Sequence, residues 1–427
     1  MKLHLRDTAG YVDALQRLSD RGDDDLDTVA PVVQAILHAV RTRGDEALRE
    51  YADRYDGGAP ATMEHGPEAL EAAVAQVDPA LVAVLRTAAE RVRAYHQRQV
   101  DADVRYTDGD GVSLGWRLRP IARAGVYAPG GKARYPSSVL MSAVPAAVAG
   151  VREVIVATPR PTPEILAAAH IAGVSRVFDV GGAQAIAAMA YGTATVPRVD
   201  KIVGPGNLYV ACAKKLVFGR VAIDGIAGPS EILVVADDGA DPEVVAADLL
   251  SQAEHDEAAY PLLVTTSVEA AHRALAALEA QLATLPRRSI AEVSVREHGH
   301  VFVAGDLDEA ARVVSLLASE HLALLVRDPE AMFRAVGAAG AAFLGDFTPE
   351  AAGDYLAGPS HVLPTGGAVR FSSPLGVHDF VVRTSVIRYD RASLERHAPA
   401  ITAFARAEGL EAHARAVEVR LRDRPLV

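Results

Sequence analysis

Residues 227–256 read AGPSEILVVADDGADPEVVAADLLSQAEHD, a stretch in which a short apolar run at 232–236 is followed by a helix-length segment. Such a run is typical of a buried strand. From about residue 126 onward the chain repeats this alternation, which predicts parallel sheets covered by helices on both faces. The expected strands are residues 153–157, 176–180, 201–203, 221–224, 232–236, 262–265, 300–303, 322–326 and 342–344. These strands are too many for one mononucleotide-binding unit. We therefore expect two α/β domains with a boundary near residues 228–230.

Length, charge and cysteine content limit the class of protein. A chain of 427 residues is long enough for about three domains, or for two large ones with appendages. Its net charge of -12 is dispersed, and phosphate binding needs a basic face, so no nucleic-acid partner is expected. Cys212 is the only cysteine, which rules out an intrachain disulfide. The N-terminal residues lack the apolar core of a signal peptide, and no apolar run reaches about 18 residues, so we expect a cytoplasmic protein without a membrane partner.

The end of the opening stretch, LLSQAEHD at residues 249–256, is a candidate metal site. Gln252 and His255 occupy positions i and i+3 near the expected end of a helix, where such neighbours share one face. Imidazole is a common zinc ligand, whereas an amide oxygen is an unusual one. On spacing alone, a helix with a half-exposed histidine therefore remains the alternative.

Three segments lie outside the alternating pattern. Residues 104–118 read as a β-hairpin around the DGDG turn at 108–111. Residues 345–378 form a long loop-rich segment of a kind that is usually functional or disordered, and the interleaved Asp354, His361 and His378 favour function. Helices are expected at about 391–407 and 410–422. A tail this short rarely folds alone, so it must dock on something.

A glycine-rich turn at residues 204–209, GPGNLY, follows an expected strand and opens an expected helix. Asp224 lies 20 residues beyond Gly204, as in a dinucleotide-binding fingerprint, but Tyr209 takes the place of the third glycine. Backbone amides at helix starts are natural sites for phosphate. A tight strand-to-helix turn is the alternative interpretation.

Glu320 and His321 are candidates for proton transfer. A carboxylate beside an imidazole can supply two separate transfers near neutral pH. Neighbours on a strand face opposite ways, so a shared role requires a bend or a strand end, and an ordinary surface pair is the alternative. Cys212 lies among small apolar residues in an expected helix, a setting typical of an inert buried thiol rather than a nucleophile.

Several long motifs in one order resemble the histidinol dehydrogenase family over nearly the whole chain. They are GVYAPGGKARYPSSVLMSAVPA from Gly125, VGGAQAIAAMAYGT from Val180, DKIVGPGNLYV from Asp200, IDGIAGPSEILVVAD from Ile223, LLSQAEHD from Leu249, EHL from Glu320 and AGDYLAGPSHVLPT from Ala352. The resemblance implies an enzyme of histidine biosynthesis that uses zinc and oxidises L-histidinol through L-histidinaldehyde to L-histidine with two NAD.

The resemblance also implies roles for individual residues. One zinc per subunit would be held by Gln252, His255, Asp354 and His413, which would also contact the substrate. Glu320 and His321 would form the acid-base pair, with His321 touching the substrate as well. Further implied substrate contacts are Ser230, His361 and Glu408, and the implied cofactor contacts are Tyr127, Gln184 and Asn207.

The family resemblance further implies two incomplete Rossmann-like domains with parallel sheets, plus small helical segments at both ends. We expect an N-terminal helical segment over residues 1–25 and a first α/β domain, with the metal and acid-base residues, from 26–125 and 231–374. A second α/β domain on the cofactor side would span 126–230, and a C-terminal helical tail 375–427. The tail is expected to be exchanged between the subunits of a homodimer. A zinc-dependent hydrolase using the same metal site and a non-catalytic amino-acid-binding module are the alternatives.

Overall fold

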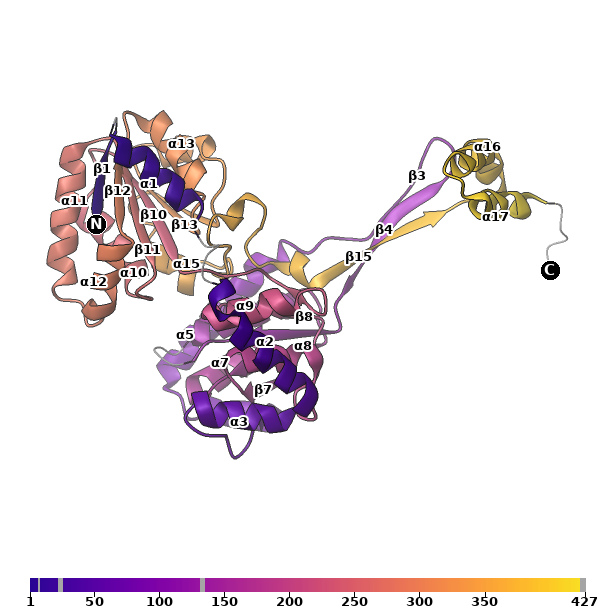
Figure 1. The fold of residues 1–427 in the computed structure, drawn as a ribbon, viewed down its shortest axis with the longest axis horizontal. Coiled ribbons are helices and arrows are strands. Elements are labelled where there is room, and N and C mark those ends of the chain that lie inside the picture. Colours follow the sequence, from indigo (N-terminus) through magenta and orange to yellow (C-terminus); the bar gives the residue numbers. More distant parts are fainter. Residues whose placement is uncertain (7, 22–25, 131–134, 423–427) are drawn as a thin grey trace. The chain divides into compact units, whose positions relative to one another are not determined.

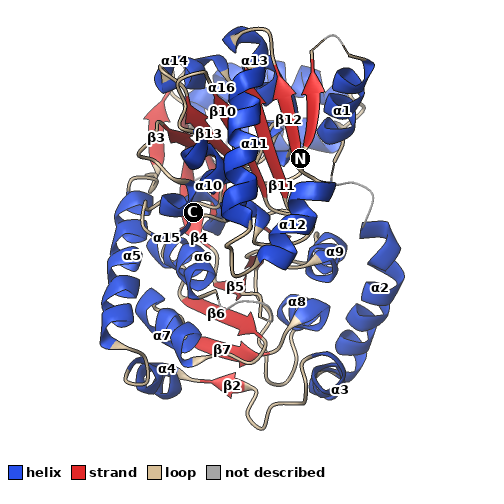
Figure 2. Cartoon of the chain, turned by 90° about the vertical axis from the view of Figure 1, so that its left-hand side faces the viewer, coloured by secondary structure: helices blue, strands red, loops and turns tan. Residues whose placement is uncertain are grey.

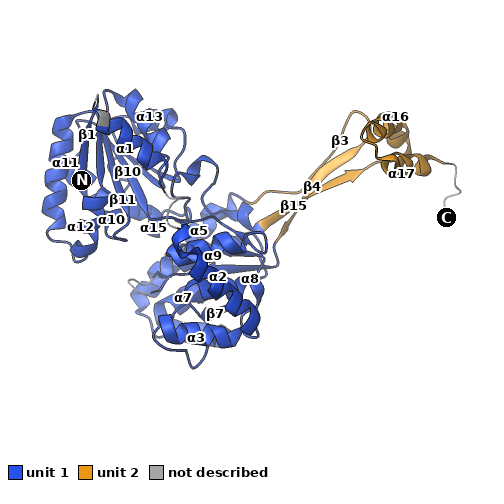
Figure 3. Cartoon of the chain, in the orientation of Figure 1, with its two compact units in different colours: residues 1–99, 121–380 blue, residues 100–120, 381–427 orange. Residues whose placement is uncertain are grey.

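The computed structural model describes residues 1–6, 8–21, 26–130 and 135–422 (Figure 1). The chain divides into two compact units, which Figure 3 colours separately. The first unit comprises Met1–Gln99 and Ile121–Phe380, and the second comprises Val100–Pro120 and Val381–Val427. Parts of three expected features lie outside the described residues: 7 and 22–25 of the N-terminal segment, 131–134 of the motif that starts at Gly125, and 423–427 of the tail.

The first unit contains two six-stranded sheets, and the first of these is entirely parallel (Figure 2). Its strands, in spatial order, are β1 (Lys2–Leu5), β12 (His300–Val303), β11 (Tyr260–Thr265), β10 (Glu231–Ala236), β13 (His321–Leu325) and β14 (Ala341–Leu344). One apolar cluster packs α10 (Pro242–Ala253), α11 (Val268–Leu282) and α12 (Arg288–Glu297) on the sheet. Another packs α1 (Ala9–Ser19), α13 (Leu307–Leu317) and α14 (Pro329–Ala335) on it. The central strands β10 to β13 are therefore buried on both faces, which explains their unbroken apolar runs.

The second sheet of the first unit is parallel except at one edge, where β2 runs antiparallel to β7. Its strands, in spatial order, are β2 (Glu64–His65), β7 (Arg176–Asp179), β6 (Glu153–Thr158), β5 (Arg123–Tyr127), β8 (Lys201–Val203) and β9 (Ala222–Ile223). One cluster packs α2 (Leu26–Arg43), α3 (Asp45–Tyr55), α8 (Gly182–Tyr191) and α9 (Leu208–Val217) together with this sheet. The other packs α4 (Pro67–Val74), α5 (Pro79–Gln97), α6 (Pro136–Val148) and α7 (Pro163–Ala172).

The rest of the first unit is loop-rich. It contains the short helix α15 (Glu350–Tyr355) and the 3-10 turns η1 (Ala368–Arg370) and η2 (Val377–Phe380). The second unit is a three-stranded antiparallel sheet in the order β15 (Val381–Arg388), β4 (Ser113–Pro120) and β3 (Val104–Thr107), followed by α16 (Arg391–Ala407) and α17 (Glu411–Leu421). Among the described residues, no helix combines the length and apolar character needed to cross a membrane.

The α/β class and the two parallel sheets confirm the predicted fold class, and each expected strand is present. The hairpin at 104–118 is confirmed as β3 and β4. Four strands were not expected: β1, β2, β5 and β15. The N-terminal segment was expected to be helical. It begins instead with β1, a strand on the edge of the first sheet.

The packing of α2 and α3 differs from the expected domain division. Both helices belong to the apolar cluster of the second sheet, with α8 and α9. They were expected in the domain with residues 231–374, whose strands form the first sheet. Helical periodicity shows that a helix has an apolar face, but it does not show which of two similar sheets that face covers. The tail likewise differs from a wholly helical segment, because β15 pairs along its length with β4.

Candidate active site

The candidate catalytic residues lie where strands of the first sheet begin. His321 is the first residue of β13, and Glu231 is the first residue of the neighbouring β10. The C-terminal end of α10 contributes Gln252, and His255 follows just after this helix. The short helix α15 contributes Asp354. The site is therefore at the amino ends of the strands, whereas ligands of open α/β sheets usually bind at the carboxyl ends.

Glu320 and His321 share one partner, Glu231. The Glu231 main-chain N–H donates to Oε2 of Glu320 at 2.9 Å, and Nδ1 of His321 lies 2.8 Å from the Glu231 carbonyl oxygen. Because that carbonyl can only accept, Nδ1 carries a proton, and Nε2 is the atom at which the ring gains or loses its second proton. Glu320 precedes the first residue of β13, so the strand end allows both side chains to contact the same neighbour.

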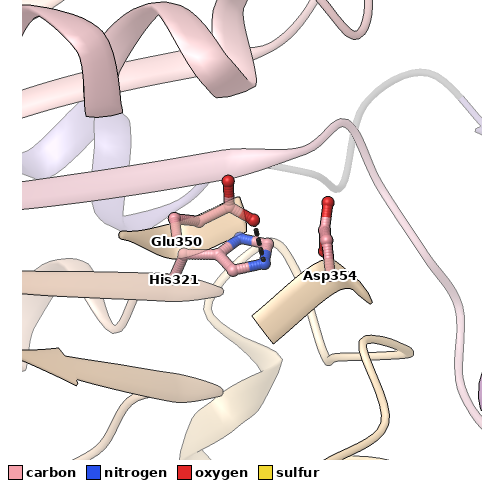
Figure 4. Close-up of side chains that lie close together, drawn as sticks. All are labelled: His321, Glu350 and Asp354. Carbon is pink, nitrogen blue, oxygen red and sulfur yellow. Dashed lines mark ion pairs between the residues drawn. The ribbon is translucent and has the colours of Figure 1, made fainter. Parts of the chain in front are cut away.

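His321, Glu350 and Asp354 form a cluster that could hold a metal ion (Figure 4). One ligand atom from each lies within 4.8 Å of the others. Nε2 of His321 is 3.6 Å from Oε1 of Glu350, and this carboxylate oxygen is buried without a hydrogen-bond partner among the described residues. Asp354 and His321 were predicted from the sequence, and Glu350 was not.

The charges in this cluster favour a bound cation. Burial disfavours the charged imidazole of His321, but Glu320, Glu350 and Asp354 outweigh it and raise the pKa of His321 to about 10. Burial, together with the charge of Asp354, raises the pKa of Glu350 to about 7. Several carboxyl groups thus surround one imidazolium, and the cluster has an excess of negative charge. A divalent cation would neutralise that excess.

Asp354 stays ionised in this crowded setting. Burial opposes its ionisation, but the hydrogen bond and charge of His361 prevail and hold the pKa of Asp354 below its usual range. Nδ1 of His361 lies 3.4 Å from Oδ1 of Asp354. The structure therefore brings His361, an expected substrate contact, beside an expected metal ligand.

Gln252 is buried at the end of α10. Neither of its amide atoms forms a hydrogen bond of normal geometry with a described residue, although Gln252 lies close enough to Glu350 to help lower the pKa of that carboxyl. Burial lowers the pKa of His255, against the charges of Asp354 and Glu320, so that its imidazole tends to be neutral. A neutral imidazole, an amide oxygen and carboxylates with free lone pairs are chemically suitable ligands for zinc.

The other expected residues of the substrate site are more scattered. Ser230 is half-buried directly before β10, and its carbonyl accepts a hydrogen bond from the N–H of Tyr260 at 2.9 Å. Glu408 is the C-cap residue of α16, and His413 lies in the first turn of α17. Both are exposed and belong to the second unit.

The expected cofactor residues lie at the carboxyl ends of strands in the second sheet. Tyr127 ends β5, and its hydroxyl accepts from the N–H of Gly182 at 3.1 Å. Burial raises the pKa of Tyr127 to about 12. Gln184 is buried in the first turn of α8, and Asn207 caps α9 by accepting from the N–H of Val210 at 3.1 Å. From β5 the strand order continues through β6 and β7 on one side and through β8 and β9 on the other. The carboxyl ends of these strands therefore include the topological switch point, where α/β sheets bind ligands.

The structure gives the GPGN turn a different explanation from a dinucleotide fingerprint. Asp224 accepts from the Gly204 N–H at 2.7 Å and forms an ion pair with the buried Lys214, which also donates to the Gly204 carbonyl at 3.0 Å. The Asp224 carboxylate thus stabilises the turn through these contacts and does not have the role of a ribose-binding carboxylate. Gly204 has φ of +111°, and a Cβ there would lie 2.1 Å from the Tyr127 carbonyl oxygen, so close backbone approach requires glycine. Cys212 is buried in α9, and burial raises the pKa of its thiol.

Comparison with known proteins identifies the family. A family model described as histidinol dehydrogenase matches residues 19–421. The histidinol dehydrogenase of Syntrophotalea carbinolica is 52% identical over 429 residues, covering 99% of this chain and 100% of that protein. The chain belongs to the histidinol dehydrogenase family. The Aquifex aeolicus member is 50% identical over 411 residues, covering 96% of each chain.

The crystal structure of histidinol dehydrogenase from Elizabethkingia anophelis has the same fold. It matches with a TM-score of 0.92 at 34% identity and covers 99% of this chain and 98% of that one. The family predicted from the motifs is thus confirmed, and with it the assignment as an NAD-dependent oxidoreductase.

Two residues of the site were missed by sequence reasoning in this member of the histidinol dehydrogenase family. Glu350 is four residues before Asp354, a spacing that places both on one face of a helix, but the segment was read as a loop. Glu231 is a charged residue at the start of an otherwise apolar strand, and it is 1% exposed. A charge in such a run needs a partner, which is the signal that could have found it.

Proposed function

We propose that this chain oxidises L-histidinol through L-histidinaldehyde to L-histidine with two NAD, the last steps of histidine biosynthesis. The observation that carries the proposal is the pairing of Glu320 and His321 with the main chain of Glu231, beside the buried amide of Gln252 and the half-buried carboxylate of Asp354. Such a site combines a proton acceptor, a second carboxylate and metal ligands.

One zinc per subunit would be held by Gln252, His255 and Asp354, with His413 as a fourth ligand. Zinc, when bound, accepts nitrogen ligands such as the imidazole and amine of histidinol and so fixes the carbinol carbon for hydride transfer. Glu350 is a further candidate ligand, because its free Oε1 faces the same cluster.

His321 is proposed as the base for both oxidations. Its Nδ1–H is held by the Glu231 carbonyl, which leaves Nε2 to take the alcohol proton as hydride leaves the carbinol carbon for the first NAD. The raised pKa of His321 comes from carboxylates that lack a counter-charge. Once their charge is compensated, the imidazole can accept a proton near neutral pH.

Glu320 is proposed to act in the second oxidation. Its carboxylate would take a proton from water as that water adds to the aldehyde carbon, and the protonated His321 would return its proton to the aldehyde oxygen to give the hydrate. His321 then removes a proton from the hydrate as the second hydride leaves for a second NAD, which yields the carboxylic acid. Each proton transfer by a well-placed group is worth about 10²- to 10⁴-fold in rate. No thiolate is needed, in keeping with the buried setting of Cys212.

For the cofactor we propose contacts with Tyr127, Gln184 and Asn207, which lie along one edge of the second sheet. For the substrate we propose Ser230, His361 and Glu408 in addition to the metal ligands. The half of the first unit built on β10 and β13 would thus carry out the proton chemistry, and the half built on β5 would bind NAD. A cytoplasmic location is part of this proposal.

The activity is tested by incubating the zinc-loaded protein with histidinol and NAD while the absorbance of reduced nicotinamide is followed. Two reduced nicotinamides per histidinol, with histidine as product, are expected. A zinc hydrolase would release no reduced nicotinamide, because it would direct Glu320 at water without a hydride acceptor. A binding module would bind histidinol without turnover.

We also propose a homodimer in which the tails are exchanged, so that Glu408 and His413 complete the partner's site. Co-refolding His321→Ala with His413→Ala tests this arrangement. With random pairing, about half of the dimers are mixed, and about a quarter of all sites would carry neither lesion. If each tail serves its own chain, every site keeps one lesion and the mixture stays as inactive as its components.

A further inference from the structure

A buried ion pair lies directly behind the Glu320–His321 pair. Arg21, in the turn after α1, donates through Nε and Nη2 to both oxygens of the Glu231 carboxylate at 2.8 and 2.6 Å. The two side chains are 3% and 1% exposed. Nη1 of Arg21 donates to the Leu18 carbonyl at 2.5 Å, which ties the pair to the end of the helix. Such a bidentate arginine–carboxylate pair is among the strongest and most directional hydrogen-bonded contacts in proteins.

The same carboxylate also holds main chain at the site. Oε2 of Glu231 accepts from the N–H of Glu320 at 3.2 Å, and Oε1 accepts from the N–H of Gly366 at 2.8 Å. The Glu231 main chain in turn holds the side chains of Glu320 and His321. Glu231 and Glu320 are therefore linked reciprocally: the side chain of each accepts from the main-chain N–H of the other.

Stability alone is a weak reason for such an arrangement. Removing two charges from water costs free energy that their attraction often only offsets, so an apolar pair of similar volume would serve the core as well. An apolar pair, however, could not accept from the N–H groups of Glu320 and Gly366. The directional contacts are what the ion pair adds.

We infer that Arg21 and Glu231 are positioning residues, which hold the main chain at Glu320 and thereby fix the Glu320 carboxylate and the His321 imidazole for reaction. This inference rests on the proposed roles of Glu320 and His321. Arg21 fixes the Glu231 carboxylate, and that carboxylate fixes the start of β13. Neither residue is required to touch the substrate.

The double variant Arg21→Met/Glu231→Gln tests the inference. It removes both charges together, so neither is left buried alone, and it keeps an oxygen that can accept only part of the original set of hydrogen bonds. We expect a folded protein whose kcat falls about tenfold to hundredfold, the usual cost of losing a residue that orients a catalytic group. The KM for histidinol should stay within about twofold, because the proposed ligands remain in place. Hydrogen exchange of the amides at 319–322 should become faster than in the wild type.

The matched control is Lys201→Met/Asp379→Asn, which removes another partly buried ion pair, of 2.7 Å, between β8 of the second sheet and η2. It should leave kcat and the exchange of the 319–322 amides unchanged. A second comparison places Arg21→Met/Glu231→Gln in a Glu320→Gln background. In that background the part of the loss that runs through Glu320 is already absent, so removal of the pair should lower aldehyde oxidation by a smaller factor than it does when Glu320 is intact, since interacting residues are non-additive.

Wild-type kcat in the double variant, or an equal loss with and without Glu320→Gln, would overturn the inference. So would faster exchange without a loss of kcat. Failure of the proposed function has a different signature, namely that Glu320→Gln and His321→Ala each retain both oxidations. Should the double variant not fold, Arg21→Lys keeps the charge but loses the two-pronged contact. It should then show a several-fold lower kcat at unchanged KM, and wild-type kcat in this variant would also refute the inference.

Discussion

Replacing Gln252 by methionine should stabilise the metal-free protein while weakening metal binding. Gln252 is 1% exposed, and both of its amide atoms lack a hydrogen bond of normal geometry with a described residue. An unsatisfied buried polar group costs about 1–3 kcal/mol. Because Gln252 lies close to Glu350, we use the lower end for each of the two atoms. Methionine has a similar volume and no such groups, so the metal-free variant should be more stable than the wild type by about 2 kcal/mol.

Zinc should reverse much of this gain. A ligand that binds only the folded state stabilises it in proportion to the logarithm of its concentration over Kd. If the loss of one metal ligand weakens zinc binding a hundredfold, the stabilisation at saturating zinc falls by about 2.7 kcal/mol. The wild type and Gln252→Met should therefore differ most without metal and become similar in stability when zinc is present.

Urea unfolding with and without zinc, combined with a zinc titration, measures both effects. Ser142→Ala is the matched control, because the Ser142 hydroxyl is also buried without a partner among the described residues but lies in α6, outside the proposed site. It should stabilise the protein by about 1 kcal/mol regardless of zinc. The role of Gln252 as an unsatisfied metal ligand is refuted if metal-free Gln252→Met is no more stable than the wild type, or if zinc stabilises the two proteins equally.

Three further changes test the chemistry and the core. Glu320→Gln should oxidise supplied histidinol better than supplied histidinaldehyde, and equal losses in the two half-reactions would reject the proposed division of labour. Cys212→Ser should keep most activity in the same assays; a loss of aldehyde oxidation beyond about a hundredfold in a folded protein would restore a thiolate mechanism. Burial raises the pKa of Asp248 to about 6, so the contribution of Asp248 to the free energy of unfolding should fall as pH rises from about 4 through 6. Asp248→Asn should therefore gain up to about 3 kcal/mol over the wild type at pH 8 and less at pH 5 in urea unfolding, and a gain independent of pH would contradict this.

The sequence predicts strands well where they are buried on both faces. The run at 232–236 is apolar throughout and forms most of β10, as predicted. The strands β1 and β15 were not predicted. Both are edge strands with exposed or half-buried residues, so their side chains follow no apolar pattern. The pairing of β15 with β4 joins segments more than 200 residues apart, which local propensity cannot reveal.

The candidate site was predictable to the extent that its residues lie in long motifs. Gln252 and His255 come from one such motif, and the structure places His255 near Asp354, which comes from another motif, and Gln252 near Glu350. Glu350 and Glu231 were not predicted, because their importance depends on burial beside groups that are distant in sequence. Arg21 lies even further from the residues that it orients, and a single arginine in a polar N-terminal segment gives no local sign of being buried.

The position of the site at the amino ends of β10 and β13 leaves the opposite rim of the first sheet to other uses. Where α/β proteins commonly bind ligands, this rim is occupied by aspartates that begin helices: Asp241, Asp306 and Asp328 cap α10, α13 and α14. Asp237 likewise accepts from the N–H groups of Gly239 and Arg327 and orders the loops between them. This rim could therefore accept inserted loops or a second binding function over evolutionary time, provided that the helix caps are retained, without disturbing the residues that carry out the proposed oxidation.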